Sequence, residues 1–212
     1  KTGSVRTQAM QLWLRSDLIG MGWHAGSAVL DAFQQPMNTW ADMTHLINRE
    51  SWPIQNSPGA IAYFCGPMEG GIPDPSERGV QAKAHQEVSD AGNTWLESAP
   101  GVIWPGISTD GALDEDSLLQ GDFTGGEGRL KGQFWRANVS PSERYVMSLK
   151  GTTDARLPAD GTVYGNLVLA GDWTLNGFNA GCVEAATMSG LRASQAISGY
   201  PKDKDIQTYW EG

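Results

Sequence analysis

The spacing of apolar residues predicts several strands in the first two thirds of the chain. Alternating or short continuous apolar runs between turn residues are typical of strands. They occur over residues 7–14, 27–33, 60–65, 133–139 and 145–149. We expect the first two of these strands to pair with each other. This part of the chain should therefore carry a mixed or antiparallel sheet.

Two helices are expected among these strands. Asn38 is a candidate N-cap for a helix over residues 39–47, where large apolar residues recur at helical intervals. Ser76 is a candidate cap for a longer helix over residues 77–98. The longer helix has few large apolar residues before Trp95, so we expect it to be well exposed.

The last third of the chain has a different pattern. The apolar run at residues 166–170 predicts a strand buried on both faces, and Gly171 and Asp172 close it. A glycine-containing loop then leads to a helix over residues 182–197, which Gly199 ends. Small or apolar residues recur on one face of this helix, so we expect that face to pack closely on a sheet or a ligand. These residues are Val183, Ala186, Gly190, Ala193 and Ile197.

The composition argues against several classes of binding partner. The formal net charge of -9 opposes binding to nucleic acid or to an anionic membrane surface. No apolar run approaches the roughly 20 residues of a membrane-spanning helix, so we expect no transmembrane segment and a cytoplasmic protein. The two cysteines and three dispersed histidines have no metal-site or disulfide-framework spacing. The nine tryptophans are interpreted mainly as core residues, with the walls of an apolar pocket as the alternative.

The end of the predicted strand at residues 166–170 is the candidate site. A strand ending in Gly171 and Asp172, followed by a loop and a helix N-terminus, directs backbone N–H groups to one point beside a carboxylate. Such a point suits an electron-rich ligand edge, and the carboxylate suits ribityl or ribose hydroxyls. A plain strand-to-helix crossover has the same pattern, so the residues alone leave both interpretations open.

The same region resembles the carboxy-terminal FAD motif of flavin amine oxidases and phytoene desaturases. The resemblance lies in residues 166–174, 177–178, 181–186 and 189–190. It implies an FAD-dependent oxidoreductase that acts on a small-molecule substrate. It also implies two groups of cofactor-binding residues: Gly171, Asp172, Trp173 and Thr174 beside the ribityl chain, and Gly181, Cys182 and Val183 near the flavin ring.

The resemblance also implies an α/β fold of mixed α+β character. Residues 1–132 would belong to a substrate domain with a mixed or antiparallel sheet and helices. Residues 133–200 would be the carboxy-terminal strand-helix segment of a Rossmann-like FAD-binding domain, and residues 201–212 a tail.

The dinucleotide-binding turn expected in this family has one weak candidate. Gly20 and Gly22 form the beginning of such a pattern, but a predicted strand near Val29 follows them instead of a long helix. We interpret this candidate as a decoy, so FAD binding should require an N-terminal FAD-binding segment or subunit. Since residues 66–181 contain no cysteine, the resemblance favours FAD held noncovalently.

The choice of reaction depends on the start of the last helix. Amine oxidases of this superfamily commonly have an aromatic residue where this chain has Cys182, whereas desaturase-like members use small residues. Hydride transfer from an apolar substrate to flavin N5 is therefore favoured over amine or amino acid oxidation. A noncatalytic binding or scaffolding subunit is the alternative of another class. No side chain is identified as a catalytic base.

Overall fold

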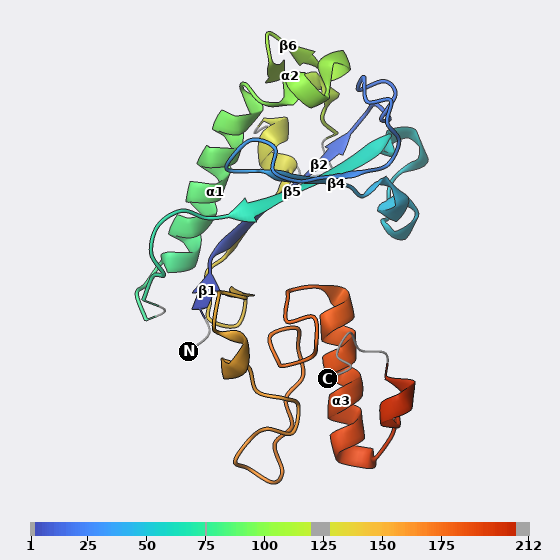
Figure 1. Cartoon of the computed structure of the whole chain (residues 1–212). Coiled ribbons are helices and arrows are strands. Elements are labelled where there is room, and N and C mark those ends of the chain that lie inside the picture. Colours follow the sequence, from blue (N-terminus) through green and yellow to red (C-terminus); the bar gives the residue numbers. More distant parts are fainter. Residues whose placement is uncertain (1–2, 75, 120–127, 207–212) are drawn as a thin grey trace. The chain divides into compact units, whose positions relative to one another are not determined.

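A computed structural model describes residues 3–74, 76–119 and 128–206 of the chain (Figure 1). The chain divides into two compact units. We call Arg6–Glu143 the sheet unit, and Lys1–Val5 together with Arg144–Gly212 the loop unit. The functional division expected after residue 132 stays a prediction, since it concerns cofactor and substrate roles and not compactness.

The sheet unit is built on a five-stranded antiparallel sheet of order β3-β4-β5-β2-β8. Its strands are β2 (Thr7–Leu14), β3 (Val29–Leu30), β4 (Thr39–Asp42), β5 (Ala60–Pro67) and β8 (Phe134–Asn138). β2 lies between β5 and β8, so that Met10 pairs with Phe64 on one side and with Trp135 on the other. The strands predicted at residues 7–14, 60–65 and 133–139 are therefore confirmed.

Helix α1 (Val80–Leu96) packs on this sheet, mainly against β8 (Figure 1). Its buried residues, Ala84, Val88, Gly92, Trp95 and Leu96, include a stripe at helical spacing. The prediction of a well-exposed helix holds for the opposite face, where Lys83, His85 and Glu87 are exposed, but not for this stripe. The helix also begins after Gly79, not at the expected Ser76 cap.

The core of the sheet unit is an aromatic cluster. The rings of Trp40 and Trp104 meet edge to face with centroids 5.5 Å apart, and the ring of Phe64 lies 4.8 Å from that of Trp95. The side chains of Trp40, Trp104 and Phe64 are fully buried. Edge-to-face aromatic pairs add to the stabilisation from buried area. The interpretation of most tryptophans as core residues is confirmed for this cluster.

Two predictions at the β3–β4 edge of the sheet were wrong. Residues 39–47 form β4 followed by the 3-10 helix η1 (Thr44–Arg49), because Trp40 and Asp42 alternate into the core while β4 pairs with β5. Only Val29 and Leu30 of the predicted strand at residues 27–33 are extended, and they pair with β4. Pairing with β2 is excluded because β5 and β8 occupy both of its edges.

Short elements connect α1 to β8. They are α2 (Pro100–Ile103), η3 (Pro105–Ile107), β6 (Ser108–Thr109), β7 (Ala112–Leu113), η4 (Glu115–Ser117) and η5 (Arg129–Gly132). A further turn, η2 (Ile54–Asn56), precedes β5.

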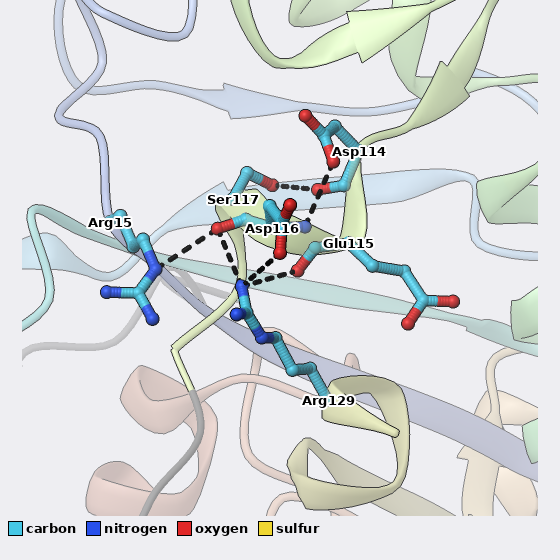
Figure 2. A network of polar contacts seen from close by, with 6 residues as sticks. All are labelled: Arg15, Asp114, Glu115, Asp116, Ser117 and Arg129. Carbon is cyan, nitrogen blue, oxygen red and sulfur yellow. Dashed lines mark hydrogen bonds and ion pairs between the residues drawn. The ribbon is translucent and has the colours of Figure 1, made fainter.

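Two arginines hold η4 in place, as Figure 2 shows. Arg15 Nε donates to the Asp116 carbonyl (3.1 Å), and Arg129 pairs with the Asp116 carboxylate (2.9 Å). These contacts anchor η4 beside the end of β2.

The loop unit has little regular structure. Strands β1 (Gly3–Val5) and β9 (Tyr145–Met147) form an antiparallel pair, and the turns η6 (Thr153–Ala155) and η7 (Asp203–Asp205) flank helix α3 (Val183–Ser198) in the sequence. The strand predicted at residues 145–149 and the last helix are confirmed. The coarse α+β class is also confirmed, with antiparallel sheets.

The buried strand predicted at residues 166–170 does not form. Residues 167–170 have no regular structure and are exposed or half-buried, and Leu169 donates one backbone hydrogen bond to Ala159 (2.8 Å). A strand buried on both faces needs paired neighbours. The described strands of this unit, β1 and β9, pair with each other instead.

No helix in the described parts of the chain has the length and apolar character needed to cross a membrane. A cytoplasmic location stays a prediction.

Asp42 provides a test of the β4–η1 corner. Its side chain is buried and accepts hydrogen bonds from the Thr44 amide (3.0 Å) and hydroxyl. Burial raises the pKa of Asp42, but hydrogen bonds from Ser27 and Thr44 outweigh it, and the pKa lies below its usual value. A lowered pKa stabilises the fold above the unfolded-state pKa of about 4, and this stabilisation is lost at lower pH.

We therefore expect Asp42→Asn to lower the free energy of unfolding by about 1–2 kcal/mol at pH 7, with a smaller difference near pH 3. Urea unfolding at both pH values measures it. Asp110→Asn is the control, because Asp110 is exposed and its left-handed backbone (φ 52°) suits Asn. Equal differences at the two pH values would contradict this account.

Candidate functional site

The Gly171–Thr174 turn is folded tightly onto itself. Gly171 has φ +142°, and a Cβ atom there would lie 2.4 Å from Trp173 Nε1, so the position requires glycine. Thr174 is fully buried, and its hydroxyl lies 2.9 Å from the Gly171 carbonyl oxygen. Ser189 of α3 accepts the Gly171 N–H (2.9 Å) and contacts the Thr174 hydroxyl (2.7 Å). These bonds attach the turn to α3.

The backbone carbonyl of Asp172 is hydrogen-bonded, whereas its carboxylate is not. Its carbonyl accepts hydrogen bonds from Arg156 Nη1 and Asn176 Nδ2, both at 3.0 Å. Its carboxylate is half-buried and makes no hydrogen bond or ion pair with residues 3–74, 76–119 or 128–206. The turn thus fixes the backbone while the carboxylate oxygens stay available to donors on a ligand, such as hydroxyl groups.

The loop after the turn is organised by two buried asparagines. Asn176 Oδ1 accepts the N–H groups of Phe178 (3.1 Å) and Asn179 (3.0 Å), and its Nδ2 donates to the carbonyls of Asp172 and Thr174. Asn179 has a left-handed backbone with φ 52°, a conformation that Asn tolerates better than most residues. Side chains therefore satisfy backbone groups that no strand satisfies here.

The start of α3 is capped by Cys182. Its backbone is extended, and its sulfur accepts the Ala185 N–H at 3.4 Å. Just before it, the Tyr145 hydroxyl donates to the Gly181 carbonyl (2.7 Å). A Cβ atom at residue 181 would lie 2.1 Å from the Tyr145 ring, so Gly181 is required for this approach. Val183 at the first helical position is 79% exposed.

Charges link the turn to the start of α3. The Arg156 side chain is 3% exposed and donates through Nη2 to the Ser148 hydroxyl (2.9 Å), which in turn donates to the Asn179 carbonyl. The pKa of Tyr145 is raised by burial and by the negative charge of Asp172, while the positive charge of Arg156 acts in the opposite direction. The charges of Asp172 and Arg156 therefore both act on the pKa of Tyr145, in opposite directions.

The face of α3 that was expected to pack closely is mostly exposed. Val183 and Ile197 are 79% and 76% exposed, and no atom lies within 4 Å of a Cβ built on Gly190. Within the loop unit, α3 packs through a stripe that shares only Ala193 with the expected face. The buried residues of that stripe are Ala185, Met188, Ser189 and Ala193.

The structure places every predicted site residue in the loop unit. Ser189 connects the turn to α3, and Tyr145 connects the start of α3 to β9. The cofactor contacts assigned to these residues stay predictions. Thr174 is fully buried with its hydroxyl engaged, so in this fold it holds the turn closed.

Sequence reasoning missed Arg156 and the paired asparagines. Asn176 precedes Gly177 and Phe178, a polar turn pattern that indicates side-chain-to-backbone bonding. No pattern marks Arg156 as buried, because its local sequence is that of an exposed loop.

The glycines near residue 20 form a turn of a different kind. Gly22 N–H bonds to the Ile19 carbonyl (2.9 Å), and Trp23 N–H bonds to the Leu18 carbonyl (2.8 Å). No helix follows before β3. The interpretation of this segment as a decoy, and not as a dinucleotide-binding turn, agrees with this local structure.

A comparison with protein families finds a similarity in this region of the chain. Residues 132–198 match the model of the flavin containing amine oxidoreductase family. The match includes β8, β9, the Gly171–Thr174 turn and α3. The matched family is the one that the motif resemblance indicates, and a flavin is the cofactor that its description implies. Searches of curated proteins and of solved structures gave no match.

Asn176 is the residue whose loss should loosen the candidate site most directly. Asn176→Ala leaves the N–H groups of Phe178 and Asn179 without their acceptor, which costs about 1–3 kcal/mol for a buried group. We expect faster hydrogen exchange at the Asn179 amide. Asn48→Ala, at an exposed position, is the control. Unchanged exchange at Asn179 would show that the loop is held by other contacts.

Proposed function

We propose that this chain forms the flavin-facing, carboxy-terminal part of an FAD-dependent oxidoreductase. The observation that carries the proposal is the Asp172 carboxylate, which has no partner among the described residues and stands on a turn bonded to α3. It lies within the segment that matches the flavin containing amine oxidoreductase family. We infer that the loop unit completes a Rossmann-like FAD-binding domain in the assembled enzyme.

In this proposal, each part of the loop unit has a separate task. The Asp172 carboxylate accepts hydrogen bonds from ribityl hydroxyls, and the N–H groups at Val183 and Glu184, ahead of the Cys182 cap bond to Ala185, face an electron-rich edge of the ring. When bound, FAD accepts a hydride at flavin N5. Cys182 forms a small apolar wall, and its half-buried sulfur is occupied in the helix cap, so we propose noncovalent binding.

The proposed reaction is desaturase-like removal of hydride from an apolar substrate. It is supported by the small Cys182 at the start of α3. Amine or amino acid oxidation is the second candidate, and the specific observation in its favour is the Tyr145 ring, which is 42% exposed beside Gly181. The two reactions are distinguished by adding an apolar substrate or an amine to the enzyme without oxygen, because only a true substrate reduces the flavin and bleaches its colour. A noncatalytic subunit would retain flavin that no substrate class bleaches.

The role of Asp172 is tested by FAD titration of the assembled enzyme. We expect Asp172→Ala to weaken FAD binding by about 1.5–3 kcal/mol, the range for a hydrogen bond to a charged group. Asp160→Ala, an exposed acid of the same unit, should leave affinity unchanged. Unchanged affinity in a correctly folded Asp172→Ala enzyme would exclude this role.

Noncovalent binding is tested by acid denaturation of the FAD-loaded enzyme. We expect the denatured chain to have its unmodified mass, and a flavin-sized mass increment on the chain would contradict noncovalent binding.

We further propose that a dinucleotide-binding segment covers the exposed face of α3. The supporting observations are the exposed Val183 and Ile197, and the open space at Gly190 between them. Small residues on a helix face permit close packing on a sheet. The segment can belong to the same polypeptide or to a second chain.

Gly190→Leu tests this contact. The substitution meets no atom within 4 Å in the loop unit and improves helix propensity, so the isolated chain should keep its circular dichroism spectrum. Overpacking should weaken the assembly by about 1–3 kcal/mol, measured as lost FAD retention. The control is Gly71→Leu in the sheet unit, where a Cβ also meets nothing within 4 Å. Equal FAD retention by both variants would refute the docking face.

A further inference from the structure

Ser189 belongs to the buried stripe of α3, but its hydroxyl bonds outside the helix. The side chain is 1% exposed, and its oxygen lies at hydrogen-bond distance from the Gly171 N–H (2.9 Å) and from the Thr174 hydroxyl (2.7 Å). Hydroxyls within helices commonly bond back to a carbonyl one turn earlier, as Thr187 does to Val183 in α3. The hydroxyl of Ser189 serves the Gly171–Thr174 turn instead.

The contacts among Ser189, Gly171 and Thr174 form a closed ring with one consistent set of donors. The Gly171 carbonyl can only accept, so its 2.9 Å contact with Thr174 uses the single hydroxyl hydrogen of Thr174. The 2.7 Å contact between the two hydroxyls then uses the hydrogen of Ser189, whose oxygen accepts the Gly171 N–H. Each hydroxyl thus donates once and accepts once. A buried polar ring that is fully satisfied in this way favours one geometry, and the loss of either hydroxyl opens it.

The ring fixes the backbone that precedes the Asp172 side chain. Gly171 is held through its N–H by Ser189, and through its carbonyl by the hydroxyl and the N–H (3.2 Å) of Thr174. The carbonyl of Asp172 itself is held by two side-chain donors. Both peptide groups that flank the Asp172 Cα are therefore held in place, and the carboxylate can move only through its own side-chain torsions.

Ser189 is the member of this set that belongs to α3. The other groups that hold Gly171 and Asp172 come from the turn or from the loops beside it. The Ser189 contacts therefore set where the carboxylate stands relative to α3, the helix whose start is proposed to face the flavin ring. A ligand that meets both places binds well only if their spacing is correct, because binding groups must be held to within about 0.5 Å.

We propose that Ser189 is a positioning residue for FAD, and that its ring of hydrogen bonds with Gly171 and Thr174 sets the spacing between the Asp172 carboxylate and the start of α3. This inference rests on the function proposed above. Ser189 does not contact the cofactor, because its side chain is buried and its hydroxyl is engaged by the turn. It acts through Asp172, whose carboxylate it holds where the ribityl hydroxyls arrive.

FAD titration of the assembled enzyme tests this role in a double-mutant cycle. We expect Ser189→Ala to weaken FAD binding about tenfold, the effect of one lost hydrogen bond. In the Asp172→Ala background the same substitution should cause no further loss, because the carboxylate that Ser189 positions is already absent. Ser194→Ala is the control and should leave FAD affinity unchanged, since this exposed hydroxyl of α3 bonds to the Tyr200 carbonyl beyond the end of the helix.

Two further measurements guard against a folding defect. In Ser189→Ala the Gly171 N–H loses its acceptor, so the Gly171 amide should exchange hydrogen faster than in the parent, with or without FAD. If Ser189→Ala does not fold, Thr174→Val takes its place in the cycle. This variant opens the ring but leaves the Gly171 N–H bonded to Ser189 and the Gly171 carbonyl bonded to the N–H of residue 174.

Two results would overturn the positioning role. The first is an FAD affinity of Ser189→Ala equal to that of Ser194→Ala. The second is a tenfold loss that recurs in the Asp172→Ala background, because additive losses show that Ser189 only stabilises the fold. The parent and Asp172→Ala are measured first. A parent enzyme that binds no FAD, or an unchanged affinity in Asp172→Ala, refutes the proposed function itself and is thereby distinguished from a failure of the Ser189 role.

Discussion

The loop unit depends on side chains to satisfy its buried backbone. Strands and helices satisfy N–H and C=O groups by periodic bonding, but residues 171–182 have no such pattern. Asn176, Arg156 and Ser189 take over this task through directed bonds to particular backbone groups. The position of the Asp172 carboxylate follows from these bonds, because its own backbone carbonyl is held by two of the donors.

The sheet unit is stabilised by a different principle. Its core comes from alternation along β2, which directs Met10, Leu12 and Leu14 to one face beneath α1 and the aromatic cluster. Hydrophobic burial of this kind is non-directional and tolerates changes of shape. The loop unit lacks comparable burial and relies on geometry, so its local shape is more sensitive to the loss of a single polar atom.

The sequence predicted those features that depend on local pattern. Period-two alternation identified β2, β5 and β8, and the Gly199 stop identified the end of α3. Pairing was predicted less well, because the partners of β2 lie far along the chain and no local signal names them. The apolar run at residues 166–170 met the local criteria for a buried strand, yet strand formation requires neighbours that local pattern does not supply. The motif residues were found, but the buried charge of Arg156 and the asparagine network depend on tertiary contacts.

The contact between Tyr145 and Gly181 has an evolutionary consequence. The ring lies where any side chain at residue 181 would have to begin, so residue 181 cannot gain a side chain while the ring stays in place. A larger residue at 181 requires a smaller one at 145, and the reverse change requires glycine to return. We therefore expect the aromatic ring on β9 and the bare backbone before α3 to be inherited together as one character among descendants of this chain.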